Sequence, residues 1–334
     1  MLKPVVALIG ALLIATPSLA QEVNIYSARQ PQLIDPILAV FTKETGIKTN
    51  VVFLKKGMIE RLKAEGAHSL ADIILTTDIA NLSAMVNAGV TQSVSSDIIS
   101  ANIPDTYRDP DGNWFGLTMR ARILYVSKVR VAAGSLTSFE QLADPEWKGR
   151  ICVRSGLHNY NIALTSAMIA HHGADAAEAW LQGLKANLAR RPQGNDRAQI
   201  KAVWAAECDV AIGNTYYMGK MLADPEQVPW ANSVDLVFAS IGDTGAHVNL
   251  SGMAMTLAAP NKDNALKLME FLTSAQAQEI YAELNYEYPL LAGVSPSELV
   301  QSWGDFTPDS TPLIDIAAHR NEALKMAERV NFDE

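Results

Sequence analysis

Short strand-like segments alternate with helix-like segments along this chain, and this order constrains the fold more than any other feature. In the first third, we expect strands at residues 23–27, 47–53 and 72–75 and helices at residues 31–45, 58–65 and 79–87. Gly46 and Gly66 stand where two of these helices should end. Alternation of this kind is typical of α/β folds, in which helices flank a mainly parallel sheet.

A second alternating set follows, with strands expected at residues 117–127, 151–154, 210–212 and 236–239 and helices at residues 161–170, 175–188, 197–206, 264–272 and 275–284. The longest strand candidate carries Arg120 and Arg122, which call for partners because arginine is seldom buried alone. With 334 residues, the chain is longer than one hydrophobic core usually organises, so we expect two lobes.

The first 20 residues have the pattern of a secretory signal peptide. Lys3 supplies the positive start, an apolar run follows, and Ser18-Leu19-Ala20 ends the segment with small residues. The run is too short to span a membrane comfortably. We therefore expect an exported, soluble mature protein from about Gln21. Its formal net charge changes from −9 to −10 when Lys3 is removed, and this acidic balance argues against nucleic acid as a partner.

The chain has two cysteines, Cys152 and Cys208. In an oxidising compartment, an isolated pair is most simply one disulfide. The bond would tie the segment before Ser155 to the segment before Tyr216. The alternative is a pair of buried thiols.

Tyr216 and Tyr217 stand side by side after a strand candidate, at the expected start of a helix. A phenolate is a hard anionic oxygen ligand, and it suits a hard trivalent cation such as Fe³⁺. In an exported protein, this pair therefore indicates a metal clamp. The alternative is that both rings serve packing, which is the usual role of adjacent tyrosines.

Two other classes of function stay open. A binding protein for an oxyanion or an organic cation would use the arginines rather than a metal. A secreted enzyme would use a tyrosine or an arginine in catalysis. We expect no enzymatic activity, because the sequence has no His-Glu-x-x-His motif, no nucleophile elbow and no phosphate-cradling loop.

Seven short segments match motifs of a known family, and they are Ile25–Pro31, Ala71–Asp78, Arg120–Arg122, Arg154–Gly156, Asn159–Asn161, Gly213–Tyr217 and Asn249–Gly252. On these segments, the chain resembles the two-lobed periplasmic ferric-iron-binding proteins of bacterial ABC importers. The resemblance implies one lobe from residues 21–119 and 247–290, a second lobe from residues 120–246 and 291–334, and hinge strands between them.

The resemblance also implies the metal ligands. Tyr160, Tyr216 and Tyr217 match the tyrosine ligands of one branch of the family. Gln30 and Pro31 occupy the first-lobe loop where other members place a His or Tyr ligand, and Thr77 stands where another branch has a glutamate. The chain is thus similar to the branch in which three tyrosines and a small anion, such as carbonate, complete the shell.

Six further residues are expected to contact the anion or to support the ligands, and they are Arg29, Gln30, Arg120, Asn214, Ser155 and Asn195. Asn214 is expected to orient the tyrosines, to cap the helix that follows, or both. Asp78 is expected to cap a helix rather than to bind metal.

Charge balance supports a ferric site. A free phenol has a pKa near ~10, so phenols bind a metal at neutral pH by losing protons, and affinity should fall as the pH drops. Three phenolates cancel the charge of Fe³⁺, and Arg29 and Arg120 can offset a bound anion. The resemblance further implies a periplasmic monomer that delivers its iron to the permease of an ABC transporter.

Overall fold

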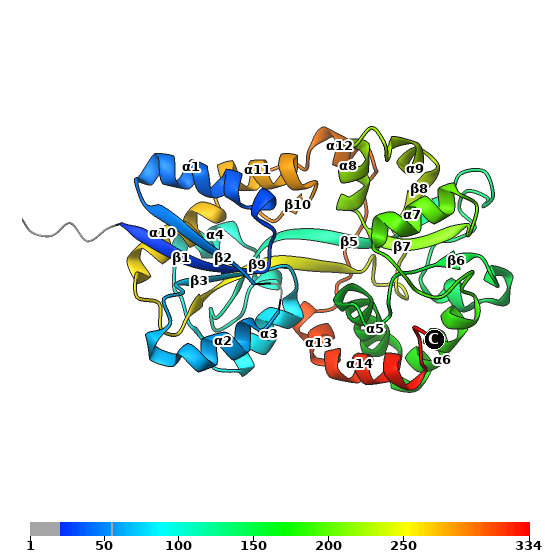
Figure 1. Ribbon diagram of the computed structural model, residues 1–334, viewed down its shortest axis with the longest axis horizontal. Helices are drawn as coiled ribbons and strands as arrows, with labels where there is room; N and C mark the ends of the chain where they lie inside the picture. Colours follow the sequence, from blue (N-terminus) through cyan, green and yellow to red (C-terminus); the bar gives the residue numbers. More distant parts are fainter. Residues whose placement is uncertain (1–20, 55) are drawn as a thin grey trace, which may run out of the picture.

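The computed structural model describes residues 21–54 and 56–334, so the expected signal peptide at residues 1–20 lies outside the described residues. Two groups of strands and helices lie side by side, and each forms a lobe (Figure 1). Two long strands, β5 (Phe115–Ser127) and β9 (Val248–Thr256), run across the middle between them (Figure 1). Within the described part, no helix is long and apolar enough to cross a bilayer.

The first lobe is built on β1 (Glu22–Ser27), β2 (Lys48–Phe53) and β3 (Ile73–Thr76), which pair in parallel in the order β2-β1-β3. Strand β9 then pairs antiparallel with β3. The other helices and strands of this lobe are α1 (Asp35–Thr45), α2 (Met58–Glu65), α3 (Ile79–Asn87), β4 (Thr91–Gln92), α4 (Asp97–Asn102), α10 (Lys262–Leu272), α11 (Ala275–Asn285) and β10 (Tyr288–Pro289).

Local signals fix where these helices begin and end. The carboxylate of Asp78 accepts a hydrogen bond from the N–H of Ala80 at 2.9 Å, which confirms Asp78 as the cap of α3. Gly46 follows α1 with a φ of 71°, a left-handed conformation that glycine adopts without strain. The observed α2 and α3 begin and end at the predicted residues.

The second lobe is built on β6 (Ile151–Cys152) and β7 (Val210–Asn214), which pair in parallel, and on β8 (Val234–Val237). Its helices are α5 (Asn159–His172), α6 (Ala174–Ala186), α7 (Asp196–Trp204), α8 (Tyr216–Leu222) and α9 (Val228–Asn232). The C-terminal part adds α12 (Glu298–Gln301), α13 (Leu313–Ala318) and α14 (Arg320–Arg329), and the last two pack against α5 (Figure 1).

Strand β5 belongs to both lobes, and every residue of it is buried. Up to Ala121, which pairs with Val248, it is bonded to β9. From Arg122, which pairs with Asn214, it is bonded to β7, and further on also to β8. The strand therefore changes partners between two consecutive residues. The two-lobed α/β fold with strands between the lobes is confirmed, and its sheet is mixed because β5 and β9 run antiparallel to their neighbours.

The predicted disulfide is confirmed. Cys152 ends β6, Cys208 lies just before β7, and the two sulfur atoms are bonded. The bond joins residues 56 positions apart in the sequence. It therefore fixes the strand that leads toward Ser155 against the strand that leads into the tyrosine pair.

Candidate metal centre

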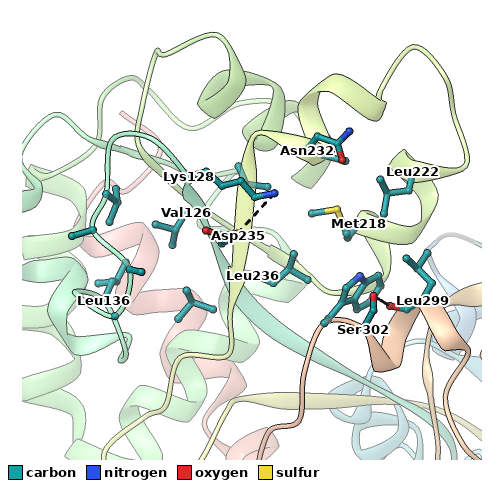
Figure 2. A pocket seen from close by; sticks show the side chains of 18 residues that line it. Val126, Lys128, Leu136, Met218, Leu222, Asn232, Asp235, Leu236, Leu299 and Ser302 are labelled. Carbon is teal, nitrogen blue, oxygen red and sulfur yellow. Dashed lines mark hydrogen bonds and ion pairs between the residues drawn. The ribbon is translucent and has the colours of Figure 1, made fainter.

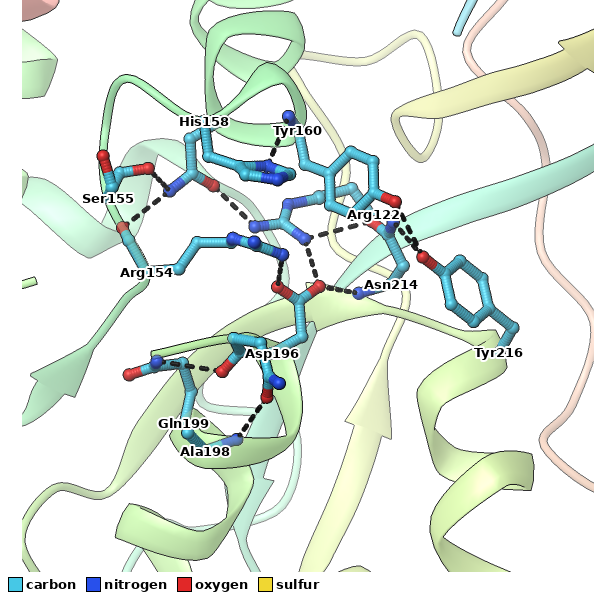
Figure 3. Close-up of polar contacts among 12 residues, drawn as sticks. Arg122, Arg154, Ser155, His158, Tyr160, Asp196, Ala198, Gln199, Asn214 and Tyr216 are labelled. Carbon is cyan, nitrogen blue, oxygen red and sulfur yellow. Dashed lines mark hydrogen bonds and ion pairs between the residues drawn. The ribbon is translucent and has the colours of Figure 1, made fainter. Parts of the chain in front are cut away.

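The three predicted tyrosines come together in the second lobe. Tyr216 and Tyr217 are the first two residues of α8, directly after β7, and Tyr160 lies in the first turn of α5. The hydroxyl oxygens of Tyr160 and Tyr216 are 3.0 Å apart (Figure 3), and the ring centres of Tyr216 and Tyr217 are 4.4 Å apart. All three side chains are only partly exposed. The local fold thus gathers three phenols at the ends of two helices.

The main chain at Tyr160 is held by its own neighbour. His158 occupies the cap position of α5, and its Nδ1 accepts a hydrogen bond from the N–H of Tyr160 at 3.2 Å. The two rings also meet edge to face, with centres 4.6 Å apart. These contacts restrict the backbone and the ring at the residue that must project its hydroxyl toward Tyr216.

The surroundings of the tyrosine pair keep its phenols protonated. Burial raises the pKa of Tyr216 well above its ordinary value of 10.0, and the nearby Tyr160 and Tyr217 raise it further. Burial also raises the pKa of Tyr217 to about 12, with Tyr160 as the next cause. The pair is therefore neutral at physiological pH in the metal-free protein, and only a strongly charged cation can displace its protons.

A buried ionic network lies directly behind the tyrosines (Figure 3). Asp196 accepts hydrogen bonds from Arg122 at 2.7 Å and from Arg154 at 2.9 Å. Arg122 also donates to the side-chain oxygens of Asn214 at 3.0 Å and Asn161 at 2.5 Å. The exposed fraction of the side chain is 3% for Arg122 and 0% for Asp196, so this ion pair is shielded from water.

Asn214 links this network to a tyrosine. Its side-chain nitrogen lies 3.5 Å from the Tyr216 hydroxyl, and its oxygen accepts from Arg122. Asn214 is the last residue of β7, and Thr215 holds the cap position of α8 without a capping side-chain bond. Of the two roles predicted for Asn214, the structure places it beside a tyrosine and not at the cap.

Arg120 lies on the other side of the strand crossing. Its guanidinium carbon is 5.9 Å from the centre of the Tyr160 ring, and its Nη2 donates to the carbonyl of Thr77 in the first lobe. The side chain is buried, and its Nη1 has no hydrogen-bond partner among the described residues. Arg120 therefore lies near the tyrosines with donor capacity unused, and its contact with an anion stays a prediction.

Arg29 and Gln30 lie in the loop after β1, in the first lobe. Arg29 is buried and forms an ion pair with Glu287 at 2.9 Å, and it also donates to Ser251. Gln30 is exposed, and its side-chain oxygen accepts from Gln32. Neither side chain makes a direct contact with a tyrosine hydroxyl, so their roles toward an anion also stay predictions.

Ser155 and Asn195 have partners of their own. Ser155 donates to the carboxylate of Asp333, near the C-terminus. The side-chain oxygen of Asn195 accepts from the N–H of Ala198 at 3.1 Å and caps α7. Both residues flank the ionic network, Ser155 after Arg154 and Asn195 before Asp196. Anion contact by either one stays a prediction.

Sequence reasoning flagged Arg122 as a buried cation in need of a partner, but it did not identify that partner. Asp196, Arg154 and Asn161 were missed as parts of the site. Arg154 and Asn161 lie in two of the segments that carry the family resemblance, but nothing in the sequence joins them to Asp196, because the three come from the segment after β6, from α5 and from α7. Only the folded chain brings their side chains together.

Tyrosine is the residue type best placed to hold a metal here. Among residues 21–54 and 56–334, no group of three or more His, Cys, Asp and Glu side chains could hold an ion. A cavity of about 520 Å³ lies elsewhere in the second lobe, with Met218 and Leu222 of α8 on its wall (Figure 2). The tyrosine hydroxyls do not open into it, so that cavity is separate from the candidate centre.

Residues 68–302 match the model of a protein family described as bacterial extracellular solute-binding proteins. The chain belongs to this family. It is 44% identical over 301 residues to the iron uptake protein A1 of Synechocystis, and the match covers 89% of this chain and 84% of the relative. The sequence resemblance to periplasmic ferric-iron-binding proteins is thereby confirmed, while membership of a three-tyrosine branch stays a prediction.

Solved structures of the family share the fold. The apo ferric ion-binding protein A of Pasteurella haemolytica is 48% identical, with a TM-score of 0.91, and the match covers 94% of this chain and 99% of that chain. A Trichodesmium protein solved with iron and citrate is 38% identical, with a TM-score of 0.88 and coverage of 93% and 99%. The similarity therefore extends over both lobes and the strands between them.

Proposed function

We propose that this protein captures ferric iron in the periplasm through Tyr160, Tyr216 and Tyr217 and delivers it to an ABC permease. The observation that carries the proposal is the 3.0 Å separation of the Tyr160 and Tyr216 hydroxyls, with the Tyr217 ring centre 4.4 Å from that of Tyr216. Three phenols that converge in this way offer a hard, anionic oxygen face to a trivalent ion. The iron-binding names of several relatives support the same cargo.

A small anion completes the coordination in this proposal. Three phenolates neutralise Fe³⁺, and further ligands must come from outside the tyrosine cluster. Arg120 offers a buried donor without a partner beside Tyr160, and Arg29 adds a second cation from the first lobe. Carbonate fits this role, and citrate is the ligand present with iron in the Trichodesmium structure. Arginine suits either anion, because guanidinium binds carboxylate-like oxygens in a bidentate manner.

Colour tests the proposal. Phenolate bound to Fe³⁺ produces a visible charge-transfer band, which neither a free phenol nor free iron gives. The purified protein, stripped of metal and reloaded with Fe³⁺, should become coloured and retain one iron per chain in metal analysis. The double variant Tyr216→Phe with Tyr217→Phe should stay colourless, because it keeps the rings but loses two ligand oxygens.

Tyr107→Phe is a matched control, since Tyr107 is a partly buried tyrosine of the first lobe and is not part of the cluster. This variant should colour like the parent protein. A parent protein that stays colourless after loading would contradict the iron proposal. It would favour instead a family member that binds an oxyanion or an organic cation. Catalytic turnover that survives complete metal removal would favour an enzyme.

A further inference from the structure

The carboxylate of Asp196 contacts both arginines behind the tyrosines, Arg122 and Arg154. Its Oδ2 accepts from Arg122 at 2.7 Å and from the main-chain N–H of Asn214 at 3.0 Å, while its Oδ1 accepts from Arg154 at 2.9 Å. Both oxygens are thus used, and the side chain has no exposure to solvent. Breaking any of these contacts would leave a buried charge without its partner, so the carboxylate of Asp196 is held in one position.

The network reaches the tyrosines by two routes. Through the first, Arg122 binds the oxygen of Asn214, whose nitrogen then faces the Tyr216 hydroxyl at 3.5 Å. Through the second, the guanidinium carbons of Arg154 and Arg122 lie 5.3 Å and 5.7 Å from the centre of the Tyr160 ring. Stacking of this kind is favourable because the ring face is electron-rich. The first route therefore reaches Tyr216 and the second reaches Tyr160, the two residues whose hydroxyls are 3.0 Å apart.

The geometry points to Asp196, acting through Arg122 and Asn214, as the positioning residue that holds Tyr160 and Tyr216 at the spacing needed to bind one metal ion. The role in metal binding rests on the proposed function, whereas the positioning of the two tyrosines can be observed in the metal-free protein. Partners of metal ligands typically change metal affinity about 10–100-fold when they are removed.

A second cluster of the same lobe provides an internal comparison. Asp209 also bridges two arginines, Arg130 at 2.5 Å and Arg150 at 2.7 Å. This cluster has no contact with Tyr160 or Tyr216 among the described hydrogen bonds and ring contacts, and its groups are less deeply buried. It therefore matches the chemistry of the Asp196 network without its connection to the tyrosines.

Three variants test the inference. Asp196→Asn removes the charge that holds both arginines, and Asn214→Ser shortens the group that faces Tyr216 without leaving a buried charge unpaired. Asp209→Asn is the control. We expect the first two to weaken Fe³⁺ binding about 10–100-fold and to shift the charge-transfer band, and we expect the control to stay within about twofold of the parent protein.

Crystal structures of the metal-free variants give a readout that does not depend on iron. In Asn214→Ser, the Tyr160 and Tyr216 hydroxyls should move beyond hydrogen-bond distance, and in Asp209→Asn they should stay together. If Asp196→Asn does not fold, Asn214→Ser decides the question alone. A folded Asn214→Ser protein with the parent hydroxyl spacing overturns the inference, whether or not the protein binds iron. Loss of positioning in a protein that binds no iron would instead reject only the proposed function.

Discussion

Lowering the pH by one unit should weaken ferric binding by at least about a hundredfold. Tyr216 has a pKa well above 10.0 and Tyr217 a pKa of about 12, so the metal-free site holds both protons at neutral pH. Each proton that is displaced on binding changes the affinity about tenfold per pH unit. Two displaced protons give about a hundredfold change per pH unit.

The direction of this pH dependence follows from whether the free or the loaded protein carries the protons. The free site is protonated and the loaded site is not, so affinity rises with pH and falls as the solution is acidified. The full slope holds at every pH below the raised pKa values, since the free tyrosines stay protonated throughout that range. A site built from carboxylates would lose its slope near neutral pH, because carboxylates are already ionised there.

The assay is a competition for Fe³⁺ against a chelator of known protonation constants, at several pH values between about 6 and 8. Direct counting of released protons, by back-titration in weakly buffered solution, provides an independent check. Tyr217→Phe should lower the slope by one proton per metal, while Tyr107→Phe should keep the parent slope. Release of fewer than one proton per iron, or a slope that Tyr217→Phe leaves unchanged, would refute the tyrosinate site.

Three further predictions concern stability, each measured by denaturant unfolding. Loss of the Cys152–Cys208 disulfide should lower the free energy of unfolding by about 4 kcal/mol, because the bond closes a loop across 56 positions; equal stability after reduction would contradict this. Gly219→Ala should lower it by about 1–3 kcal/mol, because the added carbon would lie 2.2 Å from the Tyr286 ring. Asp209→Asn should lower the free energy of unfolding by about 2 kcal/mol at pH 7. Burial raises the pKa of Asp209, but Arg130 and Arg150 outweigh burial and hold that pKa below its ordinary value. The difference in stability should therefore shrink as the pH falls below the ordinary carboxylate pKa.

Much of the secondary structure could be predicted because its signals are local. Gly66 ends α2, and Asp78 caps α3, so both helices occupy the predicted residues. The crossing strand was predicted as well, because most residues of the segment 117–127 are apolar and favour a buried strand. Its two arginines were the visible exception, and they mark where the strand passes the candidate site.

The partners of those arginines could not be predicted. A buried arginine requires an acceptor, but the chain has 36 acidic residues and the sequence does not say which one is near. Asp196 is 74 positions from Arg122, and it faces that residue only because α7 packs against β7. The tyrosine cluster was predicted from a resemblance, whereas the network behind it depends on tertiary packing.

The strand crossing separates the side-chain partners of Arg120 from those of Arg122. Arg120 pairs with β9 and binds the carbonyl of Thr77 in the first lobe, while its guanidinium carbon lies 5.9 Å from the centre of the Tyr160 ring. Arg122 pairs with β7, and its side chain binds Asp196 in the second lobe, while its main-chain N–H donates to the carbonyl of His247 at 2.9 Å. A rotation at Ala121 would therefore change the distance from Arg120 to the tyrosines but leave the Asp196 network intact. If the three tyrosines bind iron as proposed, a network that orders them before the metal arrives would reduce the conformational freedom lost on binding and so favour affinity.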